Sequence, residues 1–393
     1  MRIGIVGPAD VGHGTARVVQ DWAIVLAGAG HEVLVVDIAP AGAPPLDLGA
    51  DVVRRLQPPS GRGGITGLVA SARAAARVVA HEHRERAFDL VVTHLQLEAI
   101  AVRQAVPGVP ILGTWHSPLV DESRLNDWVY GSARRRLTWP ARRLAFEAIE
   151  RAALRSVNAI HTLSRFTWQR LTDRYGGLER RTPWHLVPGT YDEQRFHPEG
   201  ERRASRRALG LPEAGTLLVA VRRLVPRNGV ERLIAAAAAA RSAGLDARFA
   251  IAGGGWLREA LEADIAARGL DGRVTLLGRV PDAELPLLYR AGDAALMPTR
   301  ELECFGLPAI EALGSGTPCL ATPCGGLKEV LEPFPAWVAR ENGDAAFTEL
   351  VLAFLRGELP RDGEVAHASA TTRFSRAAVG PAILKAVEAA ARG

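Results

Sequence analysis

The sequence predicts an α/β protein of two domains, each built on a parallel β-sheet with helices on both faces. Three observations lead to this prediction: a strand–helix rhythm in the first half of the 393 residues, its repetition in the second half, and a break between the halves. Parallel strands need a crossover, usually a helix, to bring the chain back to the same edge of the sheet. Two such runs therefore predict two Rossmann-like domains rather than one large sheet.

In the first half, short apolar runs rich in Val, Ile and Leu predict the strands. They are Arg2–Val6, Glu32–Asp37, Leu90–His94, Ile111–Thr114 and Ala159–Leu163. Between the first two, Thr15–Ala29 predicts a helix that ends at Gly30, because glycine is favoured just beyond the last turn of a helix.

The second half repeats the pattern. Its predicted strands are Leu217–Val221, Arg248–Ala252, Val274–Leu277, Ala294–Met297 and Pro318–Ala321. The break between the halves is the Pro- and Gly-rich string P-G-T-Y-D-E-Q-R-F-H-P at 188–198. We therefore expect a first domain over 1–188, a linker over 189–200 and a second domain over 201–372.

Composition excludes several classes of protein. The hydrophobic fraction of 48%, the charged fraction of 23% and the net charge of +5 are ordinary for a soluble globular protein. No apolar run approaches the ~20 residues of a membrane span, and no basic stripe interleaved with aromatics indicates nucleic-acid binding. The three cysteines lack metal spacing and fit a reduced cytoplasmic protein. The oligomeric state stays open.

The most informative segment is T-R-E-L-E-C-F-G-L-P-A-I-E-A-L-G-S-G-T-P-C-L-A-T, residues 299–322. Glu303 and Glu311 have seven residues between them, and Pro308 suits the first position of a short apolar helix. The backbone N–H groups of 304–307 then lie at a helix N-terminus, where anions bind well. One carboxylate can accept hydrogen bonds from a sugar and the other from a second polyol, with a phosphate between them, which indicates a nucleotide-sugar.

This segment resembles the E-x7-E signature of retaining glycosyltransferases with the GT-B fold, in particular those of family four. The resemblance implies that Glu303 and the backbone of the next four residues hold the donor hexose, and that Glu311 holds the ribose. Those four residues are Cys304, Phe305, Gly306 and Leu307.

A second stretch, L-L-V-A-V-R-R-L-V-P-R-N-G at 217–229, is similar to the family's G-R-L-x-x-x-K-G, whose Arg and Lys bind the donor pyrophosphate. The resemblance places Arg223 at the Arg. The Lys position is Asn228, which brings no charge. Either Arg227 supplies the missing charge, as we favour, or nothing does and phosphate stabilisation is weakened.

Two glycine turns follow predicted strands in the second half. The string I-A-G-G-G-W at 251–256 resembles the family's I-x-G-x-G and assigns donor contact to Gly253 and Gly255. The string L-G-R-V at 277–280 stands where the family cradles the nucleobase, which places Gly278 and Val280 there. The alternative for the glycine triplet is an ordinary tight turn.

In the first half, the Gly-rich string over 7–17 gives no clean dinucleotide fingerprint. The resemblance assigns donor-phosphate contact to Gly14, with Gly12 as the alternative. It also places His116, in I-L-G-T-W-H-S-P, near the reacting carbon of the sugar. Asp121 and Glu122 follow in an expected loop and are candidates for acceptor contact.

The GT-B resemblance implies that the C-terminal segment 373–393, predicted as an amphipathic helix, crosses back onto the first domain. The stretch from Arg134 to Arg155 is rich in arginine and leucine, which would suit an anionic membrane surface. We favour the other reading, a solvated face balanced by Glu147 and Glu150, over peripheral membrane contact.

The resemblance thus implies transfer of a hexose-type sugar, with retention of configuration, from a nucleoside-diphosphate sugar, expected to be UDP-linked, to an acceptor hydroxyl. His116, Glu303 and Arg223 are the expected catalytic residues. No D-x-D string occurs, so we expect no metal and no cofactor. The pathway could be polysaccharide, glycolipid or natural-product glycosylation. The alternatives are a catalytically weak sugar-nucleotide-binding partner protein and a GT-B-fold epimerase.

Overall fold

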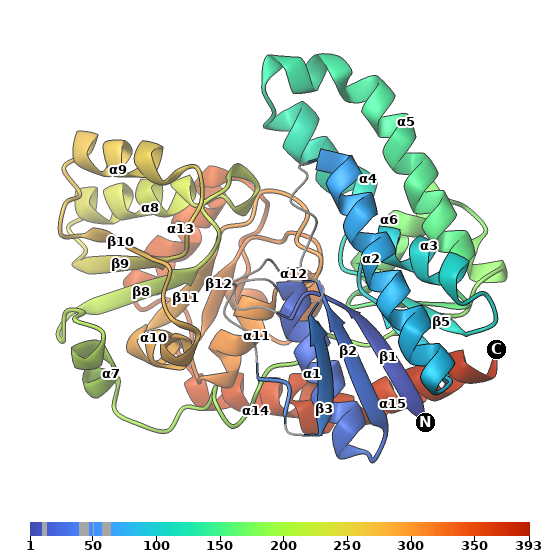
Figure 1. The fold of residues 1–393 in the computed structure, drawn as a ribbon. Coiled ribbons are helices and arrows are strands. Elements are labelled where there is room, and N and C mark those ends of the chain that lie inside the picture. Colours follow the sequence, from blue (N-terminus) through green and yellow to red (C-terminus); the bar gives the residue numbers. More distant parts are fainter. Residues whose placement is uncertain (10–13, 39–46, 50, 57–63) are drawn as a thin grey trace. The chain divides into compact units, whose positions relative to one another are not determined.

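The computed structural model describes residues 1–9, 14–38, 47–49, 51–56 and 64–393. The chain forms two compact units (Figure 1). The first unit comprises Met1–Thr190 together with Val379–Gly393, and the second comprises Tyr191–Ala378. The chain therefore leaves the first unit once and returns to it at the C-terminus.

The first unit alternates strands and helices along the chain. Its strands are β1 (Arg2–Gly7), β2 (Glu32–Asp37), β3 (Val52–Leu56), β4 (Leu90–Thr93), β5 (Ile111–Trp115), β6 (Ala159–Thr162) and β7 (Trp184–Leu186). Its helices are α1 (Gly14–Gly28), α2 (Gly64–Glu85), α3 (Gln96–Ala105), α4 (Leu119–Ser123), the π-helix η1 (Arg124–Val129), α5 (Ala133–Ser156), α6 (Arg165–Arg174) and the 3₁₀ turn η2 (Leu178–Arg180).

These strands form one sheet in the order β3-β2-β1-β4-β5-β6-β7, with parallel pairing throughout. The order reverses between β1 and β4, and such a reversal opens a crevice at the carboxyl ends of the strands. The sequence prediction missed the two edge strands. β3 contains Arg54, which pairs with Asp37 of β2, and β7 has three residues, so neither gives an apolar run.

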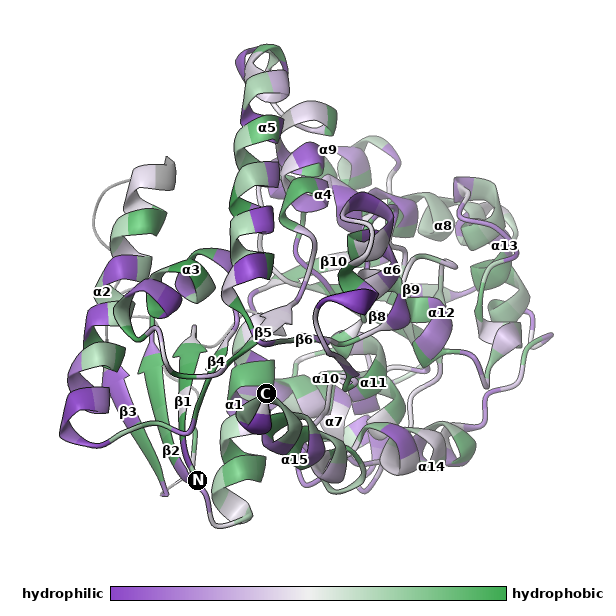
Figure 2. Cartoon of the chain, turned by 90° about the vertical axis from the view of Figure 1, so that its right-hand side faces the viewer, coloured by the Kyte–Doolittle hydropathy of each residue, from purple (hydrophilic) through white to green (hydrophobic). Residues whose placement is uncertain are grey.

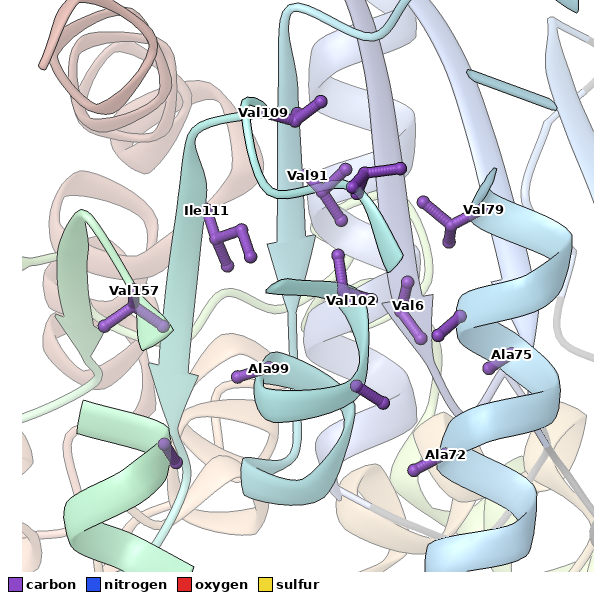
Figure 3. Packing of buried hydrophobic residues seen from close by; sticks show 14 of the residues in the cluster. Val6, Ala72, Ala75, Val79, Val91, Ala99, Val102, Val109, Ile111 and Val157 are labelled. Carbon is purple, nitrogen blue, oxygen red and sulfur yellow. The ribbon is translucent and has the colours of Figure 1, made fainter. Parts of the chain in front are cut away.

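The core of this unit lies between the sheet and helices α2 and α3 (Figure 3). Small and β-branched side chains make up much of it, together with larger ones such as Phe88 and Trp115. Those labelled in the figure are Val6, Ala72, Ala75, Val79, Val91, Ala99, Val102, Val109, Ile111 and Val157.

The C-terminal helix α15 (Arg376–Arg392) packs on the first unit from Val379 onward. Its buried side chains Val379, Ile383 and Val387 recur every four residues and so lie on one face. Figures 1 and 2 both show it beside α1. A Cβ built on Gly380 would lie 3.4 Å from the Cγ1 of Val25, which fits this close approach.

The second unit repeats the architecture with a smaller sheet. Its strands are β8 (Thr216–Val221), β9 (Ala247–Ala252), β10 (Val274–Gly278), β11 (Ala294–Met297) and β12 (Cys319–Ala321). Its α-helices are α7 (Arg202–Ala208), α8 (Glu231–Ser242), α9 (Arg258–Ala267), α10 (Leu285–Ala291), α11 (Leu307–Gly314), α12 (Leu327–Val330), α13 (Asp344–Leu355) and α14 (Gly363–Phe374). Short 3₁₀ turns are η3 (Pro226–Asn228), η4 (Asp282–Glu284) and η5 (Pro335–Trp337).

The second sheet has the order β10-β9-β8-β11-β12 and is again parallel. Its order reverses between β8 and β11. The side chains of β11 and β12 are buried along their whole length, which is typical of parallel strands covered by helices on both faces.

Helix α5 carries hydrophilic and hydrophobic residues in alternating bands (Figure 2). Leu137 and Leu144 are 83% and 68% exposed. The predicted balancing role of Glu150 is wrong: its side chain is fully buried and accepts from the N–H of Leu119, the indole of Trp115 and the hydroxyl of Tyr175. Among the residues described, no helix is long and apolar enough to cross a membrane.

The carboxyl of Glu98 on α3 yields a prediction about stability and pH. It is buried, its Oε2 has no hydrogen-bond partner among the described residues, and burial raises its pKa from 4.5 to about 7. The folded protein therefore binds this proton more tightly than the unfolded chain does. Stability is lost as the pH rises from about 4.5 to about 7. Glutamine keeps the shape without ionising, so Glu98→Gln should gain on the order of 3 kcal/mol relative to wild type by pH 8.

Chemical denaturation of both proteins at pH 5, 6.5 and 8 measures this gain. Glu85→Gln, at an exposed position on α2, is the matched control for the glutamate-to-glutamine change. Parallel pH profiles for wild type and Glu98→Gln would contradict the prediction.

Candidate functional site

The candidate site of the second unit lies where the strand order reverses, at the carboxyl ends of β8 and β11. Arg222 follows β8 directly, and Thr299 and Glu303 follow β11. In open parallel sheets ligands bind at this kind of crevice, because the two connecting loops diverge there.

Arg222 ties these loops together. Its Nη2 donates to Glu303 Oε2 at 2.6 Å, to Thr299 Oγ1 at 2.8 Å and to Asn228 Oδ1 at 3.2 Å. Thr299 also donates to the same carboxylate oxygen, at 3.1 Å. The guanidinium is buried, with 6% of the side chain exposed. A buried cation is tolerated when it is paired and hydrogen-bonded, as here.

A backbone contact links this cluster to the glycine turn after β9. A Cβ on Gly253 would lie 1.9 Å from the carbonyl oxygen of Arg222, and φ at Gly253 is +137°. The N–H of Gly253 donates to the carbonyl of Gly278 at 2.7 Å, and the N–H of Arg222 donates to that of Ala252 at 2.9 Å. The ends of β8, β9 and β10 are therefore held together through main-chain atoms. Gly255 lies in the same turn, and Val280 follows β10.

The loop before α11 is held from two sides. The main-chain carbonyl of Arg227 accepts hydrogen bonds from the N–H groups of Arg300 and Glu301. The side chain of Arg227 donates from Nη1 to the carbonyl of Leu302 at 3.4 Å. From the other side, the N–H of Gly326 donates to the carbonyl of Glu303 at 2.7 Å. Leu302 has φ +57°, a conformation that is costly for residues other than glycine and that clusters at functional sites.

Helix α11 begins at Leu307, so Pro308 is its second residue rather than its first. Gly306 precedes it with φ +104°. Phe305 is buried and packs edge-on against Phe374, with ring centroids 5.7 Å apart. Cys304 is partly buried. The first-turn N–H groups of a helix have no partner within it, so this turn has the geometry to receive an anion.

Glu311 lies one turn into α11 and is 8% exposed. The hydroxyl of Tyr289 on α10 donates to its Oε2 at 2.9 Å. Tyr289 is buried, and burial next to this carboxylate raises the pKa of the tyrosine well above its usual value. Tyr289 therefore stays a neutral donor that fixes the orientation of Glu311.

The two predicted pyrophosphate residues lie side by side on the β8 loop. Arg223 is exposed, and its carbonyl accepts from Asn228 Nδ2 at 2.9 Å. Asn228 is 7% exposed. Both functional groups of the Asn228 amide thus have partners within the loop.

In the first unit, His116 follows β5 and contacts a second histidine that follows β4. His94 Nδ1 lies 3.0 Å from His116 Nε2, and the rings stack with centroids 5.2 Å apart. Burial, together with the neighbouring His161, lowers the pKa of His116 to about 3, and burial next to His116 lowers the pKa of His94 well below its usual value. Both rings are therefore neutral at pH 7, and one donates to the other.

Of the remaining first-unit candidates, Gly14 is the first residue of α1, and the alternative Gly12 lies outside the described residues. The expected loop at Asp121 and Glu122 is wrong: both lie on α4, whose first N–H, that of Leu119, is held by Glu150. The Asp121 carboxylate is buried between Arg170 and Arg174, and Glu122 accepts from Ser117 at 2.6 Å.

No group of three or more His, Cys, Asp or Glu side chains in the described part of the chain could hold a metal ion. Metal independence remains a prediction.

Comparison with known proteins identifies the family. The family model of glycosyl transferases group 1 matches residues 201–369, and that of glycosyltransferase family 4 matches residues 12–195. The chain belongs to the group 1 glycosyltransferases. It is 32% identical over 242 residues to a 2-deoxystreptamine glucosyltransferase of Streptomyces kanamyceticus, covering 61% of this chain and 60% of the relative.

A second relative is a D-inositol 3-phosphate glycosyltransferase of Geodermatophilus obscurus, 36% identical over 216 residues and covering 51% of this chain and 46% of the relative. The matches thus span about half the length of these two relatives.

Solved structures establish the GT-B fold over the whole chain. Sucrose-phosphate synthase from Thermosynechococcus elongatus superposes with a TM-score of 0.80 at 19% identity, covering 98% of each chain. WaaG, a glycosyltransferase involved in lipopolysaccharide biosynthesis, gives 0.71 at 20% identity over 100% of each chain.

Sequence reasoning missed three side chains that contact the candidate residues of this group 1 glycosyltransferase: Arg222, Tyr289 and His94. A signal existed for the first, because Arg222 occupies the position of the glycine in G-R-L-x-x-x-K-G. Tyr289 and His94 depend on contacts between elements that are distant in sequence.

The contact at Gly253 yields a prediction about the second unit. Gly253→Ala should lower the free energy of unfolding by about 2–5 kcal/mol, because the added methyl group collides with the Arg222 carbonyl and the positive φ is strained. Thermal and urea unfolding measure the loss. Gly254→Ala is the matched control, since a Cβ there meets nothing within 4 Å. Equal stabilities of the two variants would contradict the packing described.

Proposed function

We propose that this chain is a retaining glycosyltransferase that moves a hexose-type sugar from a nucleoside-diphosphate sugar to an acceptor hydroxyl. The observation that carries the proposal is the carboxylate pair around the start of α11. Glu303, which is tied to Arg222, precedes the helix, and Glu311, which is held by Tyr289, lies one turn into it. Between them lies a helix N-terminus suited to a phosphate.

In the proposed binding mode, Glu303 accepts hydrogen bonds from hydroxyls of the donor hexose. Glu311 accepts from the ribose hydroxyls, and the N–H groups after Glu303 face the diphosphate. Gly253, Gly255, Gly278 and Val280 surround the nucleotide. Family membership and the position at the β8/β11 reversal support this arrangement.

In the proposed reaction, the bond between the sugar's anomeric carbon and the β-phosphate oxygen breaks while a bond to the acceptor oxygen forms on the same face. The acceptor's proton passes to the departing phosphate oxygen, so no protein carboxylate becomes covalently attached. Arg223 stabilises the negative charge that grows on the diphosphate. Such preorganised charge is often the largest contribution of a site to catalysis.

His116 serves in this proposal as a neutral hydrogen-bonding group for the sugar. Its lowered pKa keeps the imidazole uncharged at pH 7, and the contact with His94 restrains the ring. A neutral ring can donate to or accept from a sugar hydroxyl without attracting the diphosphate.

For the acceptor we propose a polyhydroxylated ring. Two relatives are named for 2-deoxystreptamine and for inositol 3-phosphate, and both compounds are six-membered carbocycles that bear several hydroxyls. Cyclitols and aminocyclitols are therefore the first acceptors to test, with UDP-linked sugars as the first donors. Asp121 and Glu122 remain candidates for acceptor contact.

Donor binding can be tested without knowing the acceptor. UDP or a UDP-sugar should raise the melting temperature in the presence of EDTA, because a ligand that binds only the folded state adds about 2.7 kcal/mol at a hundredfold excess over Kd. Differential scanning fluorimetry with UDP, GDP and ADP measures the shift. A shift that EDTA abolishes would contradict metal independence, and no shift with any nucleotide would contradict the donor site.

Alanine substitutions at Glu303 and at Glu311 should impair the enzyme in different ways. Glu303→Ala should lower kcat/KM by ~2–4 kcal/mol in transition-state stabilisation, as loss of a positioning hydrogen bond does. Glu311→Ala should act mainly on donor affinity. Steady-state kinetics and donor titrations on both variants separate the two effects, with Glu259→Ala on the exposed face of α9 as control. Wild-type kinetics for Glu303→Ala would overturn its assignment.

A further inference from the structure

Two positions in the loop after β8 depart together from the pattern G-R-L-x-x-x-K-G. Arg222 stands at the glycine and Asn228 at the lysine. The two side chains touch, with Arg222 Nη2 donating to Asn228 Oδ1 at 3.2 Å. One position has gained a cationic side chain, and the other has lost one.

We propose that these departures are one compensated exchange: the buried guanidinium of Arg222 supplies the positive charge for the donor diphosphate that the pattern assigns to a lysine at position 228. The proposal rests on the donor site described under the proposed function. It assigns the second diphosphate cation to Arg222 instead of Arg227.

The guanidinium has capacity for a ligand. Nη2 carries the three hydrogen bonds to Asn228, Thr299 and Glu303, whereas Nε is buried and has no partner among the described residues. A buried donor without an acceptor costs about 1–3 kcal/mol. An anionic oxygen from a ligand would remove that cost and would bind a charged donor.

The Asn228 side chain can accept a hydrogen bond from a neighbouring cation, but it carries no charge of its own. Its Oδ1 accepts from Arg222, and its Nδ2 donates to the carbonyl of Arg223 at 2.9 Å. A lysine at this position has no acceptor to offer, and its ammonium would oppose the guanidinium at short range. Conversely, a glycine at position 222 would remove the donor to Asn228 and the ion pair to Glu303. Each residue is therefore favourable only in the presence of the other.

Arg227 has a different set of contacts. Its main-chain carbonyl receives two N–H groups of the loop before Glu303, and its side chain reaches the carbonyl of Leu302. These contacts support the loop backbone. The contacts to Asn228 and to the Glu303 carboxylate belong to Arg222, which also lies at the β8/β11 reversal.

A double-mutant cycle tests the exchange. The probe is UDP, or GDP or ADP if wild type binds one of these more tightly, and calorimetry measures its affinity for Arg222→Gly, Asn228→Lys and the double variant. Arg222→Gly and Asn228→Lys should each weaken binding ~10-fold or more, whereas the double variant should return to within ~3-fold of wild type, since contacting residues are non-additive.

Two further variants distinguish a loss of nucleotide binding from a loss of folding. Arg206→Ala removes another buried arginine of the same unit, which pairs with Asp293 at 2.9 Å. It should lower the melting temperature and leave nucleotide affinity unchanged. Arg222→Lys keeps the charge and should bind the nucleotide more tightly than Arg222→Gly. If the glycine variant does not fold, Arg222→Lys takes its place in the test. Adding Asn228→Lys to Arg222→Lys should then weaken nucleotide binding further and should not restore it.

The outcomes are distinct. Additive single effects, or tighter binding by Asn228→Lys alone, would overturn the exchange while leaving the donor site intact. If folded wild-type protein bound none of the three nucleotides, the donor site and the exchange would both be overturned. Strong loss in Arg227→Ala with wild-type affinity in Arg222→Gly would assign the charge to Arg227 instead.

Discussion

Parallel pairing is the constraint on which the rest of the structure depends. Every strand of a parallel sheet ends at the same edge, so the loops that follow the strands gather there whatever their distance in sequence. In the second unit this brings Arg222, Gly253 and Gly278 into main-chain contact and places Glu303 against the arginine. The helices cover both faces of each sheet and leave this edge as the place where polar groups can meet a ligand.

Polar groups at that edge are restrained by one another. The carboxylate of Glu303 is held by an arginine and a threonine, and that of Glu311 by a tyrosine. In the first unit, His116 is held in the same manner by a second histidine. A site of this kind is preorganised, because the side chains are already oriented before a ligand arrives. The cost of burying these polar groups is offset by their mutual hydrogen bonds.

The sequence predicted the α/β class, the GT-B family and ten of the strands, because buried parallel strands are continuous apolar runs and the loop around Glu303 has a specific string. It did not predict β3 or β7, since edge strands such as Val52–Leu56 carry arginines that pair laterally. It placed Asp121 in a loop, because the support of α4 comes from Glu150, 31 residues away from Leu119. Arg222 was overlooked for a related reason: its partners Thr299 and Glu303 lie 77 and 81 residues further along the chain.

The hydrogen bond between Arg222 and Asn228 has a consequence for how sequences like this one diverge. When two side chains form a hydrogen bond with each other, a substitution at either position alone leaves the other without its partner. Substitutions at the two positions therefore depend on each other. A method that scores each position of an alignment separately would count Arg222 and Asn228 as two independent losses of the family pattern. In the proposed exchange the two positions act as a pair, so inactivity should not be assigned to a relative from the loss of a single signature residue.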